Sequence, residues 1–178
     1  MSIHLLGGGW ADDESRWTGR FVAEARERAE GAPVIVCVLW AKTESEGAGW
    51  HDDYVDDLTK LGAGEVRIVQ LTPERQLQPT DLGSAEGIFV GGGLTPGYHA
   101  ATMPAADTIR GLVASGVPYA GFSAGAMIAG DVALLGGWRE NTSLIVGSGG
   151  LQVAGDGSVW TADRAGDTDR VAVGVLAA

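Results

Sequence analysis

Short apolar runs alternate with segments of helical periodicity along the first 130 residues, and this alternation constrains the fold more than any other feature. The run 33–39 is apolar throughout and rich in β-branched residues, which is typical of a parallel strand buried on both faces. The segment 15–29 places Trp17, Phe21 and Ala25 at helical spacing, with Arg and Glu opposite them. Short connections between such elements predict an α/β three-layer sandwich with a mainly parallel open sheet.

The same periodicities set the expected elements. We predict helices at 15–29, 50–61, 98–114 and 123–129, and strands at 3–6, 33–39, 65–71, 85–90 and 117–121. After residue 143 the sequence pattern changes to short β-like runs at 144–146, 151–153, 159–161 and 170–173. Gly, Asp and Ser separate these runs, which predicts a small C-terminal antiparallel β segment. No second domain or internal repeat is visible, so we expect a single domain over 1–178.

Charge and composition exclude several functions. The formal net charge is −11, and the first 100 residues carry 16 Asp and Glu against 8 Lys and Arg. A chain without a basic stripe is not expected to bind nucleic acid or an anionic membrane surface. No apolar stretch approaches a membrane span and no signal peptide is visible, so we expect a cytoplasmic protein. Cys37 lies in the apolar run 33–39 and is expected to be a buried structural thiol.

The pentapeptide 121–125, Gly-Phe-Ser-Ala-Gly, lies between a predicted strand and a predicted helix and fits the pattern G-x-S-x-G. A sharp strand-to-helix turn leaves no room for side chains beside the serine, so small residues flank it. Such a turn exposes the hydroxyl of Ser123 near free backbone N–H groups that favour developing negative charge. Two readings stay open, because Ser123 is either a nucleophile or simply the cap of the helix.

A second glycine-rich turn, Gly91-Gly92-Gly93, also follows a strand and precedes a helix. Consecutive glycines let the backbone approach a ligand closely. Three interpretations stay open for this turn: half of an oxyanion hole, a phosphate cradle, or merely a tight turn. The phosphate cradle lacks the Lys and Ser/Thr of a P-loop. A third such turn, 7–9, ends the first strand, and we predict that Gly9, Trp10 and Leu94 line a substrate cleft.

Two of these blocks, "GIFVGGGLTPGYHAA" and "GFSAGAMIAGD", resemble the dipeptidase E and cyanophycinase family of serine peptidases. The runs "IHLLGGGW" and "ENTSLIVGSGGLQVAGDGSVW" are similar to other blocks of that family. The resemblance implies the class I glutamine amidotransferase-like fold and hydrolysis of small peptides, often at acidic residues. It also implies Ser123 as the nucleophile, with Gly92, Gly93 and Ala124 as oxyanion donors, and it implies no metal or organic cofactor.

The sequence departs from the family at the general base, which the family takes from a histidine downstream of the nucleophile. No histidine follows Ser123, and the family blocks abut between Arg139 and Glu140, where a histidine-bearing segment is missing. Among the three histidines present, His99 is the substitute base that we consider first, because it follows the Gly91-Gly92-Gly93 turn. His4 and His51 are expected to be structural.

Three hypotheses follow from these features. The first is a serine-type peptidase that acts on small peptides through an acyl-enzyme at Ser123. The second is a non-catalytic relative that keeps the turn and binds a small acidic ligand or a protein partner. The third, an amidotransferase-like glutaminase, is disfavoured because that chemistry uses cysteine and Cys37 lies elsewhere. The short helix after Ser123 leaves an apolar face, which predicts a homodimer.

Overall fold

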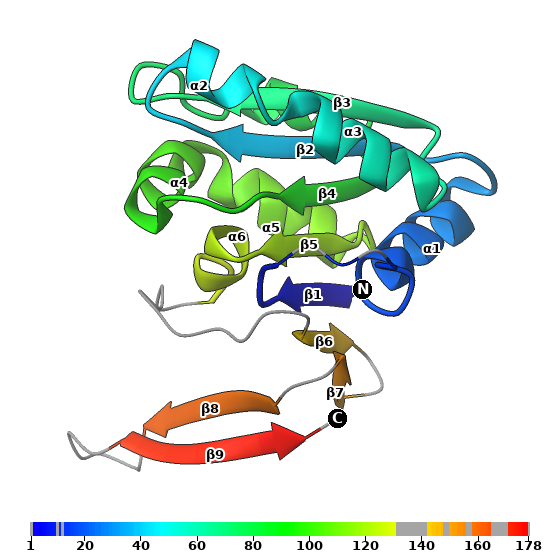
Figure 1. The fold of residues 1–178 in the computed structure, drawn as a ribbon, viewed down its shortest axis with the longest axis vertical. Helices are drawn as coiled ribbons and strands as arrows, with labels where there is room; N and C mark the ends of the chain where they lie inside the picture. The colour runs from blue at the N-terminus through cyan, green and yellow to red at the C-terminus, as the bar shows by residue number, and fades with distance from the viewer. Residues whose placement is uncertain are drawn as a thin grey trace.

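The computed structural model describes residues 2–9, 11, 13–130, 142–147, 150–155, 158–164 and 171–177. Its main element is a seven-stranded sheet in the order β3-β2-β4-β5-β1-β6-β7 (Figure 1). The first five strands along this order are parallel to one another, whereas β6 pairs antiparallel with β1 and β7. The predicted α/β fold with a mainly parallel open sheet is therefore confirmed.

The strands of this sheet match the apolar runs of the sequence closely. Their bounds are β1 Ser2–Leu6, β2 Val34–Trp40, β3 Glu65–Leu71, β4 Gly87–Val90, β5 Tyr119–Phe122, β6 Thr142–Gly147 and β7 Gly150–Gly155. The β2 strand lies between β3 and β4, and residues 35–39 are all buried, as the continuous β-branched run indicates.

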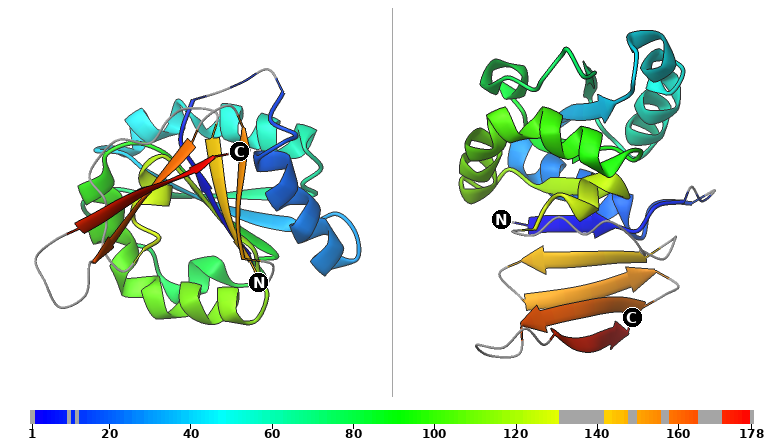
Figure 2. Two further views of the ribbon diagram at one scale, coloured as in Figure 1. Left: turned by 90° about the horizontal axis from the view of Figure 1, so that it is seen from below. Right: turned by 90° about the vertical axis from the view of Figure 1, so that its left-hand side faces the viewer.

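Helices cover both faces of the parallel part of the sheet (Figure 2). Their bounds are α1 Thr18–Ala29, α2 Glu44–Ala48, α3 His51–Lys60, α4 Thr95–Thr102, α5 Ala106–Ala114 and α6 Ala124–Met127. Short 3₁₀ turns occupy Pro79–Leu82 (η1) and Met103–Ala105 (η2).

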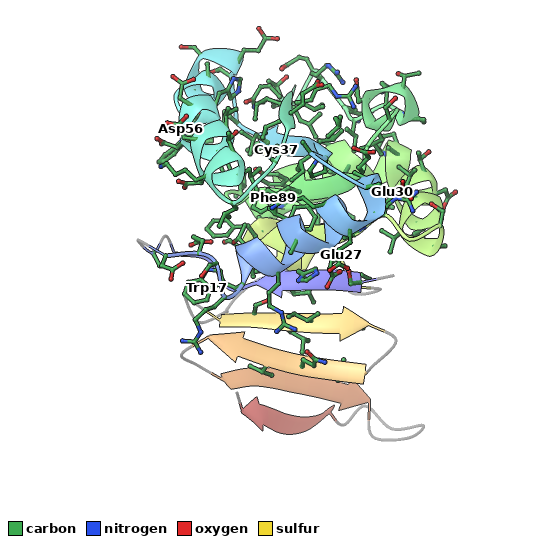
Figure 3. The ribbon with its side chains drawn as sticks, turned by 90° about the vertical axis from the view of Figure 1, so that its right-hand side faces the viewer. Trp17, Glu27, Glu30, Cys37, Asp56 and Phe89 are labelled. Atoms are coloured by element: carbon green, nitrogen blue, oxygen red, sulfur yellow. The ribbon has the colours of Figure 1, made fainter. Side chains whose placement is uncertain are left out.

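Each face of the sheet has its own core. One core packs Phe21 of α1 and Leu58 of α3 against Cys37 and Phe89. Figure 3 shows Cys37 and Phe89 inside, with Glu27 and Asp56 on the outer sides of their helices. The other core packs α4 and α5 against the alternate residues of the strands, including Val36, Val38 and Val90. Burial raises the pKa of the Cys37 thiol, consistent with a structural role.

Two predicted elements differ from the structure. The single helix expected at 98–114 is wrong: α4 and α5 are separated by η2, which contains Pro104. Proline has no N–H to continue the helical ladder, which explains the interruption. The predicted C-terminal β segment divides, because β6 and β7 join the main sheet while β8 (Ser158–Arg164) and β9 (Val171–Ala177) form a separate antiparallel pair.

In the part of the chain that the structure describes, no helix is both long and apolar enough to cross a membrane. The single domain expected over 1–178 stays a prediction.

Candidate active site

Four parallel strands end at the same edge of the sheet, where their loops surround one cavity. Figure 1 shows β1, β2, β4 and β5 ending on this side. Ligands of open α/β sheets bind beyond the carboxyl ends of the strands. The cavity has a volume of about 370 Å³, and its lining includes Gly8, Gly9, Gly92, Gly93, Leu94 and Ser123. The three glycine-rich turns and the serine singled out in the sequence therefore meet at one site.

Ser123 has the backbone conformation of a strained turn. Its φ is 51° and its ψ is −105°, a combination that costs a non-glycine residue about 1–3 kcal/mol. The Ser123 N–H donates a 2.8 Å hydrogen bond to the Leu6 carbonyl of β1, which helps to hold this conformation. A capping serine instead has extended backbone and accepts an N–H with its side chain. Ser123 occupies the N-cap position of α6 but makes no such bond, so its side chain does not cap the helix.

The glycines on either side of Ser123 allow backbones to touch. A Cβ added to Gly121 would lie 2.4 Å from the Gly125 carbonyl oxygen. A Cβ added to Gly125 would lie 2.2 Å from the Val90 carbonyl oxygen, and the Gly125 N–H donates to Gly91 at 3.1 Å. Close approach of α6 to β4 therefore requires these glycines, as expected for a serine presented on a strand-to-helix turn.

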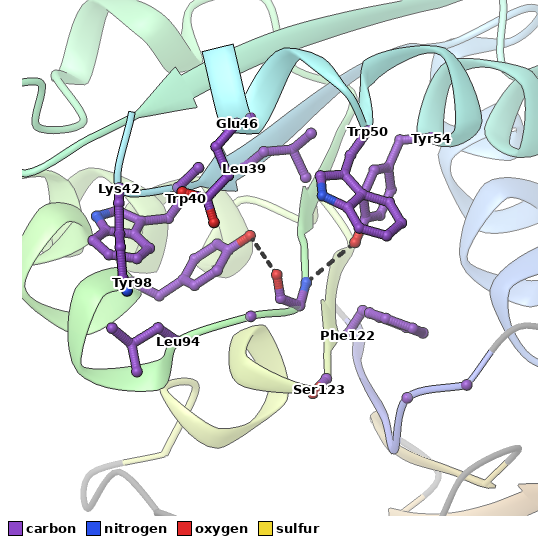
Figure 4. A pocket seen from close by; sticks show the side chains of 16 residues that line it. Leu39, Trp40, Lys42, Glu46, Trp50, Tyr54, Leu94, Tyr98, Phe122 and Ser123 are labelled. Carbon is purple, nitrogen blue, oxygen red and sulfur yellow. Dashed lines mark hydrogen bonds between the residues drawn. The ribbon is translucent and has the colours of Figure 1, made fainter. Parts of the chain in front are cut away.

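Two tyrosine hydroxyls hold the peptide groups of Gly92 (Figure 4). Tyr98 of α4 donates to the Gly92 carbonyl at 3.0 Å, and the Gly92 N–H donates to the Tyr54 hydroxyl at 3.3 Å. Both rings are buried, and burial raises the pKa of Tyr54 to about 12 and raises that of Tyr98 as well. Both hydroxyls therefore stay protonated at neutral pH, and the loop is fixed from one side.

This anchoring determines which backbone N–H groups face the cavity. The described peptide bonds are all trans, so the Gly93 N–H points opposite to the Gly92 carbonyl and away from Tyr98. In Figure 4, Ser123 lies on the side of the loop away from the two tyrosine hydroxyls. Among the described residues, none accepts a hydrogen bond from the N–H of Gly93 or of Ala124. Gly92, by contrast, already donates its N–H to Tyr54.

None of the three histidines is among the described residues that line this cavity. His99 is exposed and lines a second cavity of about 350 Å³ beside α5, where Ser123 does not appear among the described lining residues. His4 is fully buried in β1 with Nε2 3.3 Å from Glu24, and burial lowers its pKa. His51 Nε2 lies 2.9 Å from the Gln70 side-chain oxygen.

Several predicted features fall outside the described residues. They are Trp10 and the join between Arg139 and Glu140. Leu94 does line the cavity and is 51% exposed.

The cavity also has walls that sequence reasoning did not predict. They are formed by Leu39, Trp40, Lys42, Glu46, Trp50, Tyr54, Tyr98 and Phe122, among others. Tyr54 and Tyr98 look like ordinary core positions of amphipathic helices, so their hydroxyl contacts leave no signal in the sequence. Lys42 and Glu46 follow the end of β2, which was the available clue to their position at this edge. Among the described residues, no cluster of His, Cys, Asp and Glu suits a metal ion.

Comparison with known proteins agrees with this geometry. The model of peptidase family S51 matches residues 28–134, which include both the Gly91-Gly92-Gly93 turn and Ser123. A 1.5 Å crystal structure assigned as a peptidase E protein of Listeria monocytogenes EGD-e is 15% identical, with a TM-score of 0.55. That match covers 88% of this chain and 98% of the other, and it shows a shared fold. No curated protein matches the chain.

The family match spans more than half of the chain and supports a peptidase function. This protein belongs to peptidase family S51.

Proposed function

We propose that the protein is a serine-type peptidase that cleaves small peptides through an acyl-enzyme at Ser123. The observation that carries the proposal is the strained Ser123 backbone at a cavity next to the N–H groups of Gly93 and Ala124. Backbone strain of this kind persists where the surrounding structure imposes it, and it concentrates at functional sites. Unengaged N–H groups at the same place suit the oxyanion of acyl transfer.

The chemistry assigns a task to each group. Ser123 Oγ attacks the peptide carbonyl, and the new C–O bond pushes negative charge onto the carbonyl oxygen, which the N–H groups of Gly93 and Ala124 stabilise. The C–N bond then breaks, and the leaving amine takes up the proton lost by the serine. Water hydrolyses the ester and returns a proton to Ser123. Gly92 contributes indirectly, because its anchored carbonyl orients the Gly93 N–H.

The proton carrier is the open part of this mechanism. No described residue lining the cavity is a histidine, and all three histidines of the chain lie in its described part. This observation favours a second candidate, a non-catalytic relative that binds a small ligand in the same cavity. The two candidates differ in whether Ser123 reacts.

A fluorophosphonate probe separates them, because it forms an Oγ–P bond with an activated serine and releases fluoride. We expect one adduct by intact mass, lost in Ser123→Ala and kept in Ser115→Ala, an exposed serine at the other end of β5. Labelling of wild type that is no faster than that of Ser123→Ala would overturn the peptidase proposal and favour the binding protein. Loss of labelling in His99→Ala would identify His99 as the base.

A further inference from the structure

We infer that the cavity beside Ser123 selects a peptide with an apolar or aromatic side chain next to the scissile bond, and discriminates against an acidic one. This inference deepens the proposed function and rests on it, because the peptide bond is cleaved only if the protein is a peptidase. It concerns which side chain the cavity binds, and binding can be measured without any turnover.

The walls of the cavity are mainly apolar. Leu39, Trp40 and Phe122 contribute side chains to the lining, together with the rings of Tyr54 and Tyr98. Figure 4 shows these side chains arranged around the space that Ser123 borders. Pockets of this kind gain affinity from burying apolar ligand surface, and a few placed polar groups fix the ligand's orientation.

The mouth of the cavity carries two exposed apolar side chains. Trp50 is 55% exposed and Leu94 is 51% exposed, and Figure 4 places them on opposite sides of the opening. Large exposed apolar side chains grouped at a cavity mark interaction sites. A ligand side chain that enters between Trp50 and Leu94 would cover both.

The hydroxyls of Tyr54 and Tyr98, which belong to the walls, both contact the loop that carries Gly92. The Tyr98 hydroxyl donates to the Gly92 carbonyl, and the Tyr54 hydroxyl accepts from the Gly92 N–H. The N–H groups of Gly93 and Ala124 serve the reacting carbonyl in the proposed mechanism. The Tyr98 hydroxyl proton and these two N–H groups are therefore not available to a polar substrate side chain.

The charges at the cavity do not favour a carboxylate. Lys42 is the only cation among the described lining residues, and Glu46, which is the only lining carboxylate in that part of the chain, offsets it. Both side chains are exposed, so water and salt screen the attraction that Lys42 exerts on a ligand carboxylate. A carboxylate moved from water into an apolar cavity loses hydration that one screened lysine does not replace.

The experiment measures dipeptide binding to the Ser123→Ala protein by calorimetry, so that no peptide is cleaved. The ligands are Phe-Ala, Ala-Phe, Asp-Ala, Ala-Asp and Ala-Ala, which place each side chain on either side of the peptide bond. We expect one Phe dipeptide to bind about 10- to 100-fold more tightly than its Asp counterpart, as burial of one aromatic side chain implies.

Matched leucines provide the control. Leu94→Ala in this background should weaken binding of the Phe dipeptide about fivefold or more, and should weaken Ala-Ala binding by a smaller factor. Leu151→Ala removes an equally exposed leucine from β7, which is not among the lining residues described, and should change neither.

The outcomes separate this inference from the proposed function. Asp dipeptides that bind as tightly as Phe dipeptides, and lose affinity in Lys42→Gln, would overturn the inference even if Ser123 reacts with the probe. No measurable binding of any dipeptide would also overturn it. Selective binding of Phe in a protein whose Ser123 does not react would uphold the apolar selection while the peptidase proposal fails.

Discussion

Replacing Gly125 with alanine tests the geometry of the turn without any assumption about substrate. The added Cβ would lie 2.2 Å from the Val90 carbonyl oxygen, about 1 Å closer than an ordinary contact allows. Either α6 must move away from β4 or the strand must bend, and overpacking of this kind costs about 1–3 kcal/mol. The 3.1 Å hydrogen bond from the Gly125 N–H to Gly91 would lengthen as α6 moves.

Gly111 supplies a matched substitution in the same protein. It lies on the exposed side of α5, and a Cβ added there meets nothing within 4 Å. Alanine stabilises an exposed helix interior by about 1 kcal/mol relative to glycine. We therefore expect the two variants to differ by about 2–4 kcal/mol in the free energy of unfolding.

Urea unfolding followed by circular dichroism measures this difference, and thermal midpoints should separate by about 5–15 °C. Gly125→Ala should also label more slowly with the fluorophosphonate probe, whereas Gly111→Ala should label like wild type. If Gly125→Ala were as stable as Gly111→Ala, the close approach of α6 to β4 would be refuted, and with it the structural reason for the second glycine of the turn.

Three further predictions address the loop, the buried histidine and the serine itself. Tyr98→Phe removes the donor to the Gly92 carbonyl, which should lower stability by about 1–3 kcal/mol in thermal unfolding. It should also slow labelling of Ser123 about tenfold or more. Unchanged labelling would mean that the hydroxyl does not orient the loop. Burial lowers the pKa of His4, so the unfolded chain binds more protons than the folded protein. Stability should therefore fall as pH decreases below about 6.5, by at most about 1.4 kcal/mol per pH unit. Urea unfolding of wild type and His4→Gln between pH 7.5 and 5 checks this, and equal slopes of unfolding free energy against pH in the two proteins would contradict it. Ser123→Gly should be more stable than Ser123→Ala by roughly 1 kcal/mol, because glycine adopts a φ of 51° without strain and this gain exceeds the cost of its greater freedom in the unfolded chain. A urea midpoint of Ser123→Gly below that of Ser123→Ala would mean that the turn is unstrained.

The fold was largely predictable because each of its strands leaves a strong local signal. The continuous apolar run of β2 indicates burial on both faces, and the structure confirms it. The break between α4 and α5 left a signal in Pro104, but the apolar periodicity continues across it and outweighed that signal. The separation of β8 and β9 from the main sheet depends on long-range pairing, which turn residues alone do not encode.

The candidate site was predictable where close backbone packing restricts the residue type. Gly92 and Gly125 are conspicuous because close approach restricts which residue types fit. Tyr54 is different, because its ring packs in the core while its hydroxyl reaches the Gly92 N–H. From the sequence it is one more apolar-face residue of a helix. Which end of a core side chain meets a functional loop depends on how two elements pack, and that information lies in the tertiary structure.

The proposed acyl-transfer mechanism needs groups that stabilise charge and a group that moves a proton, and the described residues offer candidates only for the first task. The groups proposed to stabilise charge belong to the backbone, and hydrogen bonds hold them: Ser123 is held by Leu6, and the loop with Gly93 is held by Tyr54 and Tyr98. For the second task, no histidine is among the described residues lining the cavity. Enzymes that lose a triad member keep about 10³–10⁴-fold catalysis from the oxyanion hole and binding alone.

The presence and the absence of an internal base predict different pH dependences for the reaction of Ser123 with the fluorophosphonate probe. With an internal base, the labelling rate rises with pH and reaches a plateau above the pKa of that base. Without one, the serine must lose its proton to hydroxide, and the rate should rise about tenfold per pH unit between pH 6 and 9 with no plateau. We expect the second profile, measured by stopped labelling and intact mass. A plateau near neutral pH would refute it, and its midpoint, followed through His99→Ala and Lys42→Gln, would identify the group that carries the proton.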